Sequence, residues 1–322
     1  MDISVAICTW NRAELLDQTL QRFHQLVIPE GLTWELLVIN NACTDRTEEV
    51  VDQHRDALPL RMVKEPRAGH SRARNRAIDV AQGRWLIWTD DDVLVSPGWL
   101  ICYWSAIHSM PDASFFGGPV NPWFEKPPAK WITESWETIS SAFAIRQLGN
   151  EVLTFNHRSL PFGANFGLRL DVQKQYRYNP DLGRKEKEML SGDETVVLRQ
   201  MMADGHQGYW LPLASLEHYI PAHRLTLDYV KKYYHGLGRT AVVVERLQNT
   251  SARNRRASKR VRSYAKIMLY SALYGLLRMV ASPSWWVPCL AKSLRHRGRL
   301  AAYRETVDPP SQPAIPSRRR AA

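Results

Sequence analysis

Short apolar runs alternate with segments of helical periodicity along the first third of the chain. Four stretches, at residues 3–8, 34–40, 60–64 and 85–89, have the length of strands, and the first is a continuous apolar run. Leu16, Leu20, Phe23 and Val27 recur at helical spacing between the first two stretches. A helix cap at Thr44 or Asp45 and a helix end at Gly83 predict a helix in each of the next two intervals. A further helix is expected to begin at Pro97, because proline suits the first helical position. Strands that alternate with helices predict a parallel sheet covered on both faces.

The pattern changes after residue 112. Strand-like stretches follow at 113–120, 162–170, 208–212 and 215–220, separated by long irregular loops. One helix is expected at 193–205, where Gly205 ends it. We expect a mixed sheet that carries a binding site in this part of the chain, not a second doubly wound unit.

From about residue 225 the sequence is helical and basic. The most apolar stretch, 266–294, is interrupted by Arg278, Pro283 and Pro288, so it lacks the roughly 20 uninterrupted apolar residues of a membrane-spanning helix. Its basic flanks and the adjacent Trp285 and Trp286 favour a helix that lies in a bilayer interface. A core-packing helical subdomain with a solvated basic face is the alternative.

Charge is distributed unevenly. The chain of 322 residues has a net charge of +11, and 17 of its 43 Lys and Arg residues lie from Arg246 onward, against two of its 32 acidic residues. The C-terminal quarter therefore carries a net charge of +15 and residues 1–245 carry −4. Such an asymmetry indicates an anionic partner, either a membrane or a nucleic acid.

The cysteines and the N-terminus indicate the compartment. Cys8, Cys43, Cys102 and Cys289 show no CxxC spacing, so neither a zinc site nor a disulfide framework is expected. The first residues lack the basic segment and the long apolar run of a secretory signal. We therefore expect a cytoplasmic protein.

Three consecutive carboxylates end the fourth apolar run. Asp90, Asp91 and Asp92 repel one another, and ligands of open α/β sheets bind beyond the carboxyl ends of the strands. A hard divalent cation such as Mg²⁺ or Mn²⁺ would neutralise them. A second acidic point, Asp193 and Glu194, stands at a predicted helix start. The alternatives are a solvated loop for the aspartates and simple stabilisation of the helix dipole for the acid pair.

Six motifs in a fixed order connect these points. They are "VAICTWNRAELLDQTL", "ELLVINNACTDRT", "RAGHSRARNRAIDVAQGRWLIWTDDD", "PFGANFGLRLDV", "SGDETVVLRQMMADGH" and "EHYIPAHRLTLDYV". Together they resemble the family 2 glycosyltransferases, which have the GT-A fold and use nucleotide-sugar donors. The resemblance covers roughly residues 3 to 240. It implies a Rossmann-like, mostly parallel sheet with helices on both faces, and the basic helices would be a C-terminal extension.

The resemblance also implies an organisation and a donor site. A catalytic domain would span 1–222, a helical, basic segment that could associate with a membrane 223–305, and a disordered tail 306–322. Asp90 and Asp92 match the outer acids of the family's DxD element and Asp91 its middle position; with His218 the outer acids would hold Mn²⁺ or Mg²⁺. The other residues that match nucleotide-sugar-binding positions are Thr9, Asn11, Arg12, Asn40, Gly69, Arg74 and Asn75. Asn40 stands where the family usually has an acid, so the identity of the nucleotide base stays open, with a UDP-sugar favoured.

The acid pair takes the place of the family's catalytic base. Glu194 is the positional match and Asp193 is the alternative, because the family more often has Glu-Asp in this order. Between the two acidic points, Trp123 and Asn165 are expected to contact the acceptor, since aromatic faces stack on sugars and lipids.

The implied function is transfer of a sugar, with inversion, from a nucleoside-diphosphate sugar to a hydroxyl of a glycan or lipid-linked acceptor. We expect this reaction in cell-envelope or exported-glycan synthesis, at the inner face of the cytoplasmic membrane. A nucleotidyltransferase would need a glycine-rich first turn, which "CTWNRAEL" lacks. The alternative is a basic nucleic-acid- or membrane-binding protein without transferase activity. Because the net positive charge lies outside a mildly acidic body, no nucleic-acid partner is expected.

Overall fold

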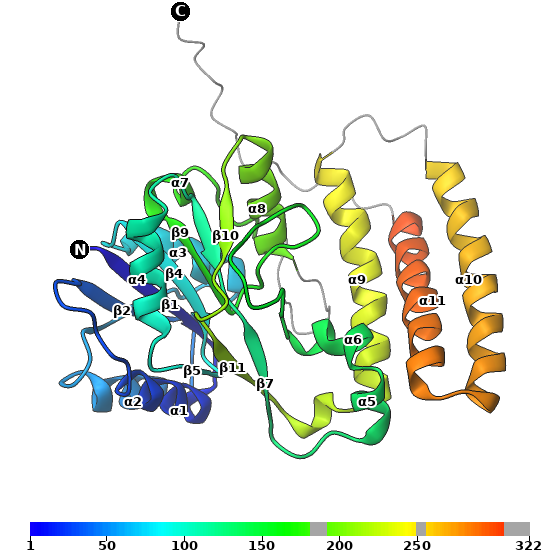
Figure 1. Cartoon of the computed structure of the whole chain (residues 1–322), viewed down its shortest axis with the longest axis horizontal. Coiled ribbons are helices and arrows are strands. Elements are labelled where there is room, and N and C mark those ends of the chain that lie inside the picture. The colour runs from blue at the N-terminus through cyan, green and yellow to red at the C-terminus, as the bar shows by residue number, and fades with distance from the viewer. Residues whose placement is uncertain (181–191, 249–255, 306–322) are drawn as a thin grey trace, which may run out of the picture.

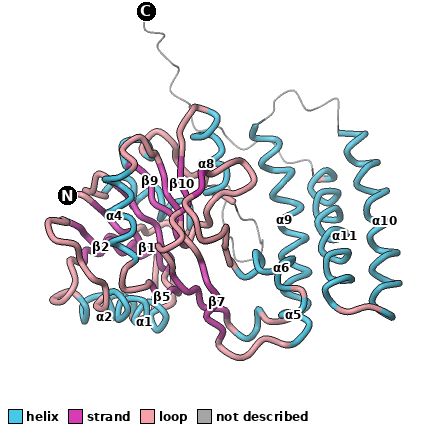
Figure 2. The backbone as a smooth tube through the Cα atoms, in the orientation of Figure 1, coloured by secondary structure: helices cyan, strands magenta, loops and turns pink. Residues whose placement is uncertain are grey.

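A computed structural model describes residues 1–180, 192–248 and 256–305. The strands gather in a body that contains the N-terminal half of the chain, and three long helices stand at one end of it (Figure 1). Figure 2 shows the same division between a strand-rich part and a purely helical part.

The main sheet of the described chain has eight strands in the order β3-β2-β1-β4-β9-β6-β10-β8. The first four run parallel, as predicted, and β9 runs antiparallel to both β4 and β6. The later part is thus the mixed sheet that the sequence indicated. The strands are β1 (Ile3–Thr9), β2 (Trp34–Asn40), β3 (Leu60–Lys64), β4 (Trp85–Asp90), β6 (Phe115–Gly117), β8 (Leu153–Thr154), β9 (Asn165–Arg169) and β10 (Gly208–Trp210).

Helices cover both faces of this sheet. Because side chains alternate along a strand, Val5 and Ile7 of β1 pack in one apolar cluster and Ala6 packs in the other. The first cluster contains residues of α1 (Ala13–Phe23), α2 (Thr47–His54) and α4 (Trp99–Ser109). The second contains residues of α3 (His70–Val80) and α8 (Asp193–Ala203). The chain therefore has the α/β architecture that its apolar pattern predicts.

A small second sheet begins where the chain leaves the carboxyl end of β4. Its order is β5-β11-β7, with β11 antiparallel to β5 and parallel to β7. The pairing sets His218 opposite Val93, which follows the three aspartates directly. These strands are β5 (Val93–Val95), β7 (Val120–Phe124) and β11 (Leu216–Ile220), and the short helices are α5 (Lys130–Glu134), α6 (Trp136–Ile139), η1 (Ser140–Phe143), α7 (Leu170–Gln173) and η2 (Ala222–Arg224).

The C-terminal helices are α9 (Leu227–Gln248), α10 (Arg256–Val280) and α11 (Pro283–Arg304). They stand side by side with α11 in the middle (Figure 1). Gly238 of α9 and Gly298 of α11 allow a close approach, because a Cβ on either would collide with a carbonyl oxygen of the other helix. α11 is thereby fixed to α9.

Two sequence predictions about helices are wrong. The single interfacial helix over 266–294 is two antiparallel helices, since α10 ends at Val280 and α11 begins at Pro283. The helix expected to begin at Pro97 begins at Trp99, after Gly98. Among the described helices, none has the length and apolarity needed to cross a bilayer. The tail predicted at 306–322 lies outside the described residues.

Candidate functional site

The carboxyl ends of the parallel strands meet at one edge of the sheet. Thr9 lies opposite Asn40 on the neighbouring strand, and Cys8 lies opposite Asp90. A cleft of about 1200 Å³ opens at this edge. Its walls include the three aspartates, the start of α8 and one side of α9. The cleft thus joins the sheet to the C-terminal helices.

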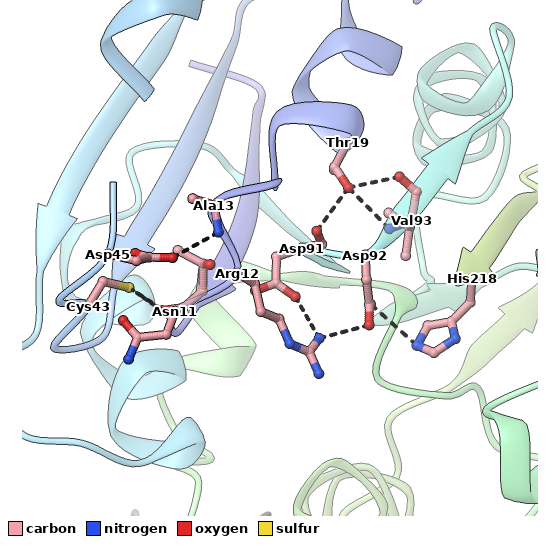
Figure 3. Close-up of polar contacts among 11 residues, drawn as sticks. Asn11, Arg12, Ala13, Thr19, Cys43, Asp45, Asp91, Asp92, Val93 and His218 are labelled. Carbon is pink, nitrogen blue, oxygen red and sulfur yellow. Dashed lines mark hydrogen bonds and ion pairs between the residues drawn. The ribbon is translucent and has the colours of Figure 1, made fainter. Parts of the chain in front are cut away.

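The turn at residues 90–92, called the aspartate turn, is held by two side chains from the α1 region (Figure 3). The Arg12 guanidinium donates to Asp91 Oδ1 at 3.0 Å and to Asp92 Oδ2 at 2.8 Å. The Thr19 hydroxyl lies 3.1 Å from the Asp91 carbonyl oxygen and accepts from the Val93 amide at 3.1 Å. Arg12 is therefore the counter-charge that stabilises adjacent carboxylates at a strand end.

This compensation is incomplete. Burial raises the pKa of Asp91 to about 7; Arg12 opposes this shift and the Asp92 charge adds to it. Burial acts on Arg12 in the other direction, but Asp91 and Asp92 raise its pKa above the ordinary value. Three carboxylates lie in this turn and Arg12 pairs with two of them, so a further cation would stabilise their ionised forms.

Asp90, Asp92 and His218 form a group suited to a divalent cation. One ligand atom from each lies within 4.8 Å of the others, and His218 Nε2 is 3.4 Å from Asp92 Oδ1. Two carboxylates and an imidazole are donors that Mn²⁺ accepts readily, and the carboxylates also suit Mg²⁺. The structure therefore brings together the residues predicted to hold the metal.

The acid pair lies at the start of α8, where Gly192 has φ of +101°. Asp193 Oδ2 is 3.4 Å from Arg74 Nη1, and Glu194 Oε2 is 3.7 Å from the same nitrogen. Arg74 also donates to the Gly163 carbonyl oxygen at 3.3 Å. Both acids line the cleft.

Aromatic rings surround Arg74 on its other sides. Its guanidinium carbon lies 5.5 Å from the Trp88 ring centre, 5.7 Å from that of Phe166 and 5.1 Å from that of Tyr178. Such distances allow cation–π attraction. Arg74 is thus a buried cation held between aromatic rings and the acid pair.

The two acids of the pair have opposite shifts. Burial would raise the pKa of Asp193, but Arg74 and the hydrogen bond with Glu194 hold it well below its ordinary value. Burial and the adjacent Asp193 charge raise the pKa of Glu194 to about 8. The pair therefore holds one proton near neutral pH, with Glu194 as the favoured carrier.

The other residues predicted to bind the nucleotide sugar divide into two sets. Thr9, Arg12, Gly69 and Arg74 line the cleft with the aspartates, whereas Asn11, Asn40 and Asn75 are not among its described lining residues. Asn11 Oδ1 accepts from the Thr44 amide at 2.7 Å, and Asn40 Oδ1 accepts from the Cys43 amide at 2.9 Å. Asn75 exchanges hydrogen bonds of 2.8 and 3.0 Å with the backbone of Tyr178. In this conformation these three amides order loops.

The residues predicted to contact the acceptor lie elsewhere. Asn165 is fully buried: its oxygen accepts from Trp99 and Tyr103, and its amide donates to two carbonyl oxygens. This is its full hydrogen-bonding capacity, so the acceptor role is corrected to a structural one. Trp123 packs edge-on against Tyr219 at 4.9 Å and is not among the described lining residues.

Sequence reasoning missed several lining residues. Asn41 lines the cleft where Asn40 was expected, and its side chain accepts from the Gly69 amide at 2.9 Å. Trp10, 45% exposed after β1, was detectable as a large aromatic residue at a strand end. The α9 wall had no local signal: it consists of Tyr229, Tyr233, Leu237, Thr240, Ala241, Val244 and Glu245, with Arg295 of α11 nearby.

Comparisons with known proteins agree with this geometry. Residues 4–163 match the sequence profile of "Glycosyl transferase family 2". The succinoglycan biosynthesis protein ExoM of Rhizobium meliloti is 24% identical over 249 residues, which are 74% of this chain and 74% of ExoM.

Solved structures show the same fold. A mannosyltransferase of Pyrobaculum calidifontis, in complex with GDP-Man and Mn²⁺, superposes with a TM-score of 0.56 at 14% identity, over 94% of this chain and 73% of that chain. Residues 1–349 of S. aureus TarS, in complex with UDP, give 0.52 at 13% identity, over 94% and 91%.

The profile match and the shared fold thus define a glycosyltransferase with the GT-A fold. The part of the chain that the profile matches, residues 4–163, belongs to glycosyl transferase family 2.

Proposed function

We propose that the protein transfers a sugar, with inversion, from a nucleoside-diphosphate sugar, a UDP-sugar being favoured, to a hydroxyl group of a glycan or lipid-linked acceptor. One observation carries the proposal: the group Asp90, Asp92 and His218 and the acid pair Asp193 and Glu194 face the same cleft. A metal-binding group beside a protonatable acid is the minimal equipment for this reaction.

The donor side holds the leaving group. Asp90, Asp92 and His218 would hold Mn²⁺ or Mg²⁺, with Mn²⁺ better suited to the histidine. When bound, the cation would act as a Lewis acid on the departing diphosphate. Arg12, which lies against Asp91 and Asp92, places a further positive charge at this end. Trp10 offers a partly exposed ring for stacking of the base.

The acid pair acts on the acceptor. In its ionised form Glu194 takes the proton of the acceptor hydroxyl as that oxygen bonds to C1 of the sugar. The bond between C1 and the diphosphate oxygen breaks, and its electron pair leaves with the nucleoside diphosphate. Arg74 keeps Asp193 ionised beside Glu194. Asp193 is the alternative base, as in the sequence-based assignment.

The acceptor enters along α9. Tyr229 and Tyr233 line this side of the cleft and offer rings that could stack on sugar or lipid. They take the place of Trp123 and Asn165 in the proposal. ExoM is a succinoglycan biosynthesis protein, and this likeness supports an acceptor of the envelope or exported-glycan type. The same proposal places the enzyme at the cytoplasmic face of a membrane.

The first experiment is a thermal-stability panel with UDP, GDP, dTDP and CMP, each with and without Mn²⁺. One nucleotide should stabilise the wild type only with metal, by about 2.7 kcal/mol at 100 times its Kd. Asp92→Ala should abolish the shift. Glu217→Ala is the matched control, because Glu217 is an exposed carboxylate on the same strand as His218.

Absence of a shift with every nucleotide and metal would overturn the transferase proposal. The non-catalytic alternative, a nucleic-acid- or membrane-binding protein, would then be the hypothesis to test. A thermal shift that needs no metal and survives Asp92→Ala would support the donor site but contradict the metal site.

A further inference from the structure

The outer face of α10 carries an unusual set of exposed apolar side chains. α10 packs on α11, where Tyr274 meets Trp286 at 5.9 Å and Ser271 pairs with Ser293. Away from this contact, six apolar side chains are 54% to 77% exposed. We call them the α10 stripe: Val261, Met268, Leu269, Leu276, Met279 and Val280.

The spacing of the stripe follows the helical repeat. Val261, Met268 and Met279 are 7 and 11 residues apart, so they fall on one line along the helix. Leu269, Leu276 and Val280 broaden that line on one side. The result is an apolar face about six turns long on the outermost helix of the group (Figure 1).

Positive charge flanks the stripe. Arg260, Arg262 and Arg278 are exposed on α10, and no acidic residue occurs in the sequence between Glu245 and Glu305. Trp285 is exposed just after the turn that follows α10. An apolar face with basic flanks and an adjoining tryptophan is the composition of a helix that lies in a bilayer interface.

We propose that the α10 stripe is a docking surface for an anionic lipid bilayer. A second copy of the chain fits less well, because a symmetric contact of this face would bring the arginines of both copies together. Anionic headgroups complement these arginines, and the acyl region accepts the methionine and leucine side chains.

Docking through α10 would fix the distance between the cleft and the bilayer surface. α11 ties α10 to α9, and α9 forms a wall of the cleft. Two interhelical spacings of about 8–10 Å each separate α10 from α9. An acceptor anchored in the bilayer could then reach the cleft through its headgroup. This consequence rests on the proposed function, whereas docking itself does not depend on the reaction.

The test is co-sedimentation of the full chain with lipid vesicles. Phosphatidylcholine–phosphatidylglycerol vesicles should bind at least tenfold more tightly than phosphatidylcholine alone. The double variant Met268→Glu, Met279→Glu should lose at least tenfold in binding. Leu213→Glu, an equally exposed leucine on the body, is the matched control and should bind as the wild type does.

A charge series provides an independent check. Changing Arg260, Arg262 and Arg278 to glutamine should weaken binding to the anionic vesicles by about fivefold for each arginine. Thermal shifts with nucleotide and Mn²⁺ should stay at wild-type values in every stripe variant, so failure of docking and failure of the proposed reaction are distinguishable.

Two results would overturn the proposal. One is equal vesicle binding by the wild type and the double glutamate variant. The other is a concentration-dependent dimer, seen by analytical ultracentrifugation, that the double variant abolishes; a second copy of the chain would then be the partner of the stripe.

Discussion

The cleft holds two groups of acidic residues, each beside an arginine, and the two arginines are placed differently. Arg12 pairs with Asp91 and Asp92 while 36% of its side chain remains exposed. Arg74 pairs with Asp193 and Glu194 while only 4% of its side chain is exposed. The same pairing of charges thus occurs once at the edge of solvent and once in the interior.

This difference bears on what each group can exchange. Solvent can take over the contacts of Arg12, so a metal and a diphosphate can rearrange the charges around Asp92 at modest cost. Arg74 has no such freedom, because aromatic rings and the acid pair enclose it. The first group is suited to binding and releasing charged ligands, and the second is suited to holding a fixed charge beside a group that carries a proton.

Removal of the proton carrier should give the largest effect. Glu194→Gln is nearly isosteric and should lower kcat by about 10²–10⁴-fold, since general-base catalysis contributes this much. Donor binding, measured as the nucleotide-dependent thermal shift, should remain. Asp193→Asn should have the smaller effect on kcat. The reverse ranking would make Asp193 the base and contradict the assignment of Glu194.

Removal of the buried arginine should act mainly by lowering the free energy of unfolding. Arg74→Met leaves Asp193 buried without its cation, and breaking a buried pair costs about 3–5 kcal/mol. Denaturant unfolding would measure this loss. Arg76→Met, on the same helix but partly exposed, should change stability little. Equal stability of the two variants would contradict a structural pairing of Arg74 with the acids.

The pH dependence should distinguish the two acids. If Glu194 is the base, kcat/KM should rise with pH through about 8, because the carboxylate form is needed and burial with the Asp193 charge raises its pKa. Asp193→Asn removes that charge and should move the rise to lower pH. A base at Asp193, whose pKa is lowered, would instead give a rate already constant at neutral pH.

The raised pKa has an opposite effect on stability. The folded state holds the Glu194 proton more tightly than the unfolded chain does, so the free energy of unfolding should fall as pH rises from about 4.5 to about 8. Glu194→Gln cannot lose this proton and should flatten the decline. Thermal unfolding of both proteins across this range would measure the difference.

The sequence predicted the elements whose signals are local. The stretches at 34–40 and 60–64 coincide with β2 and β3, because each has apolar residues over the length of a strand. Asp90 and Asp92 were recognisable because a strand end is a local feature. His218 came from the family resemblance, and its place beside Asp92 follows from the pairing of β11 with β5.

The remainder depends on packing between distant segments. Nothing near Arg74 in the sequence predicts its contacts with aromatic rings of β4, β9 and the loop at Tyr178. Asn165 looked like a polar group in a ligand loop, but contacts from residues 46 to 66 positions away occupy it. α9 reaches the cleft only because the C-terminal helices fold back against the body.

The smallest predicted effect concerns the exposed arginine. Arg12→Gln should lower the thermal stability of the metal-free protein by about 1–3 kcal/mol, because Arg12 is partly exposed but the carboxylates that it pairs with are buried. Asp91 and Asp92 would then lose their contacts with the Arg12 guanidinium. Mn²⁺ should restore much of this loss, so the stabilisation by metal should be larger in the variant than in the wild type.

Arg46→Gln is the control for this experiment. Arg46 is also exposed and pairs with Glu14 at 3.3 Å, away from the aspartate turn, so its loss should leave the response to Mn²⁺ unchanged. If Arg12→Gln instead abolished the response to metal, Arg12 would be needed to shape the metal site and would not be an exchangeable counter-charge. The contrast with Arg74 would then disappear, because both arginines would be fixed parts of their acidic groups.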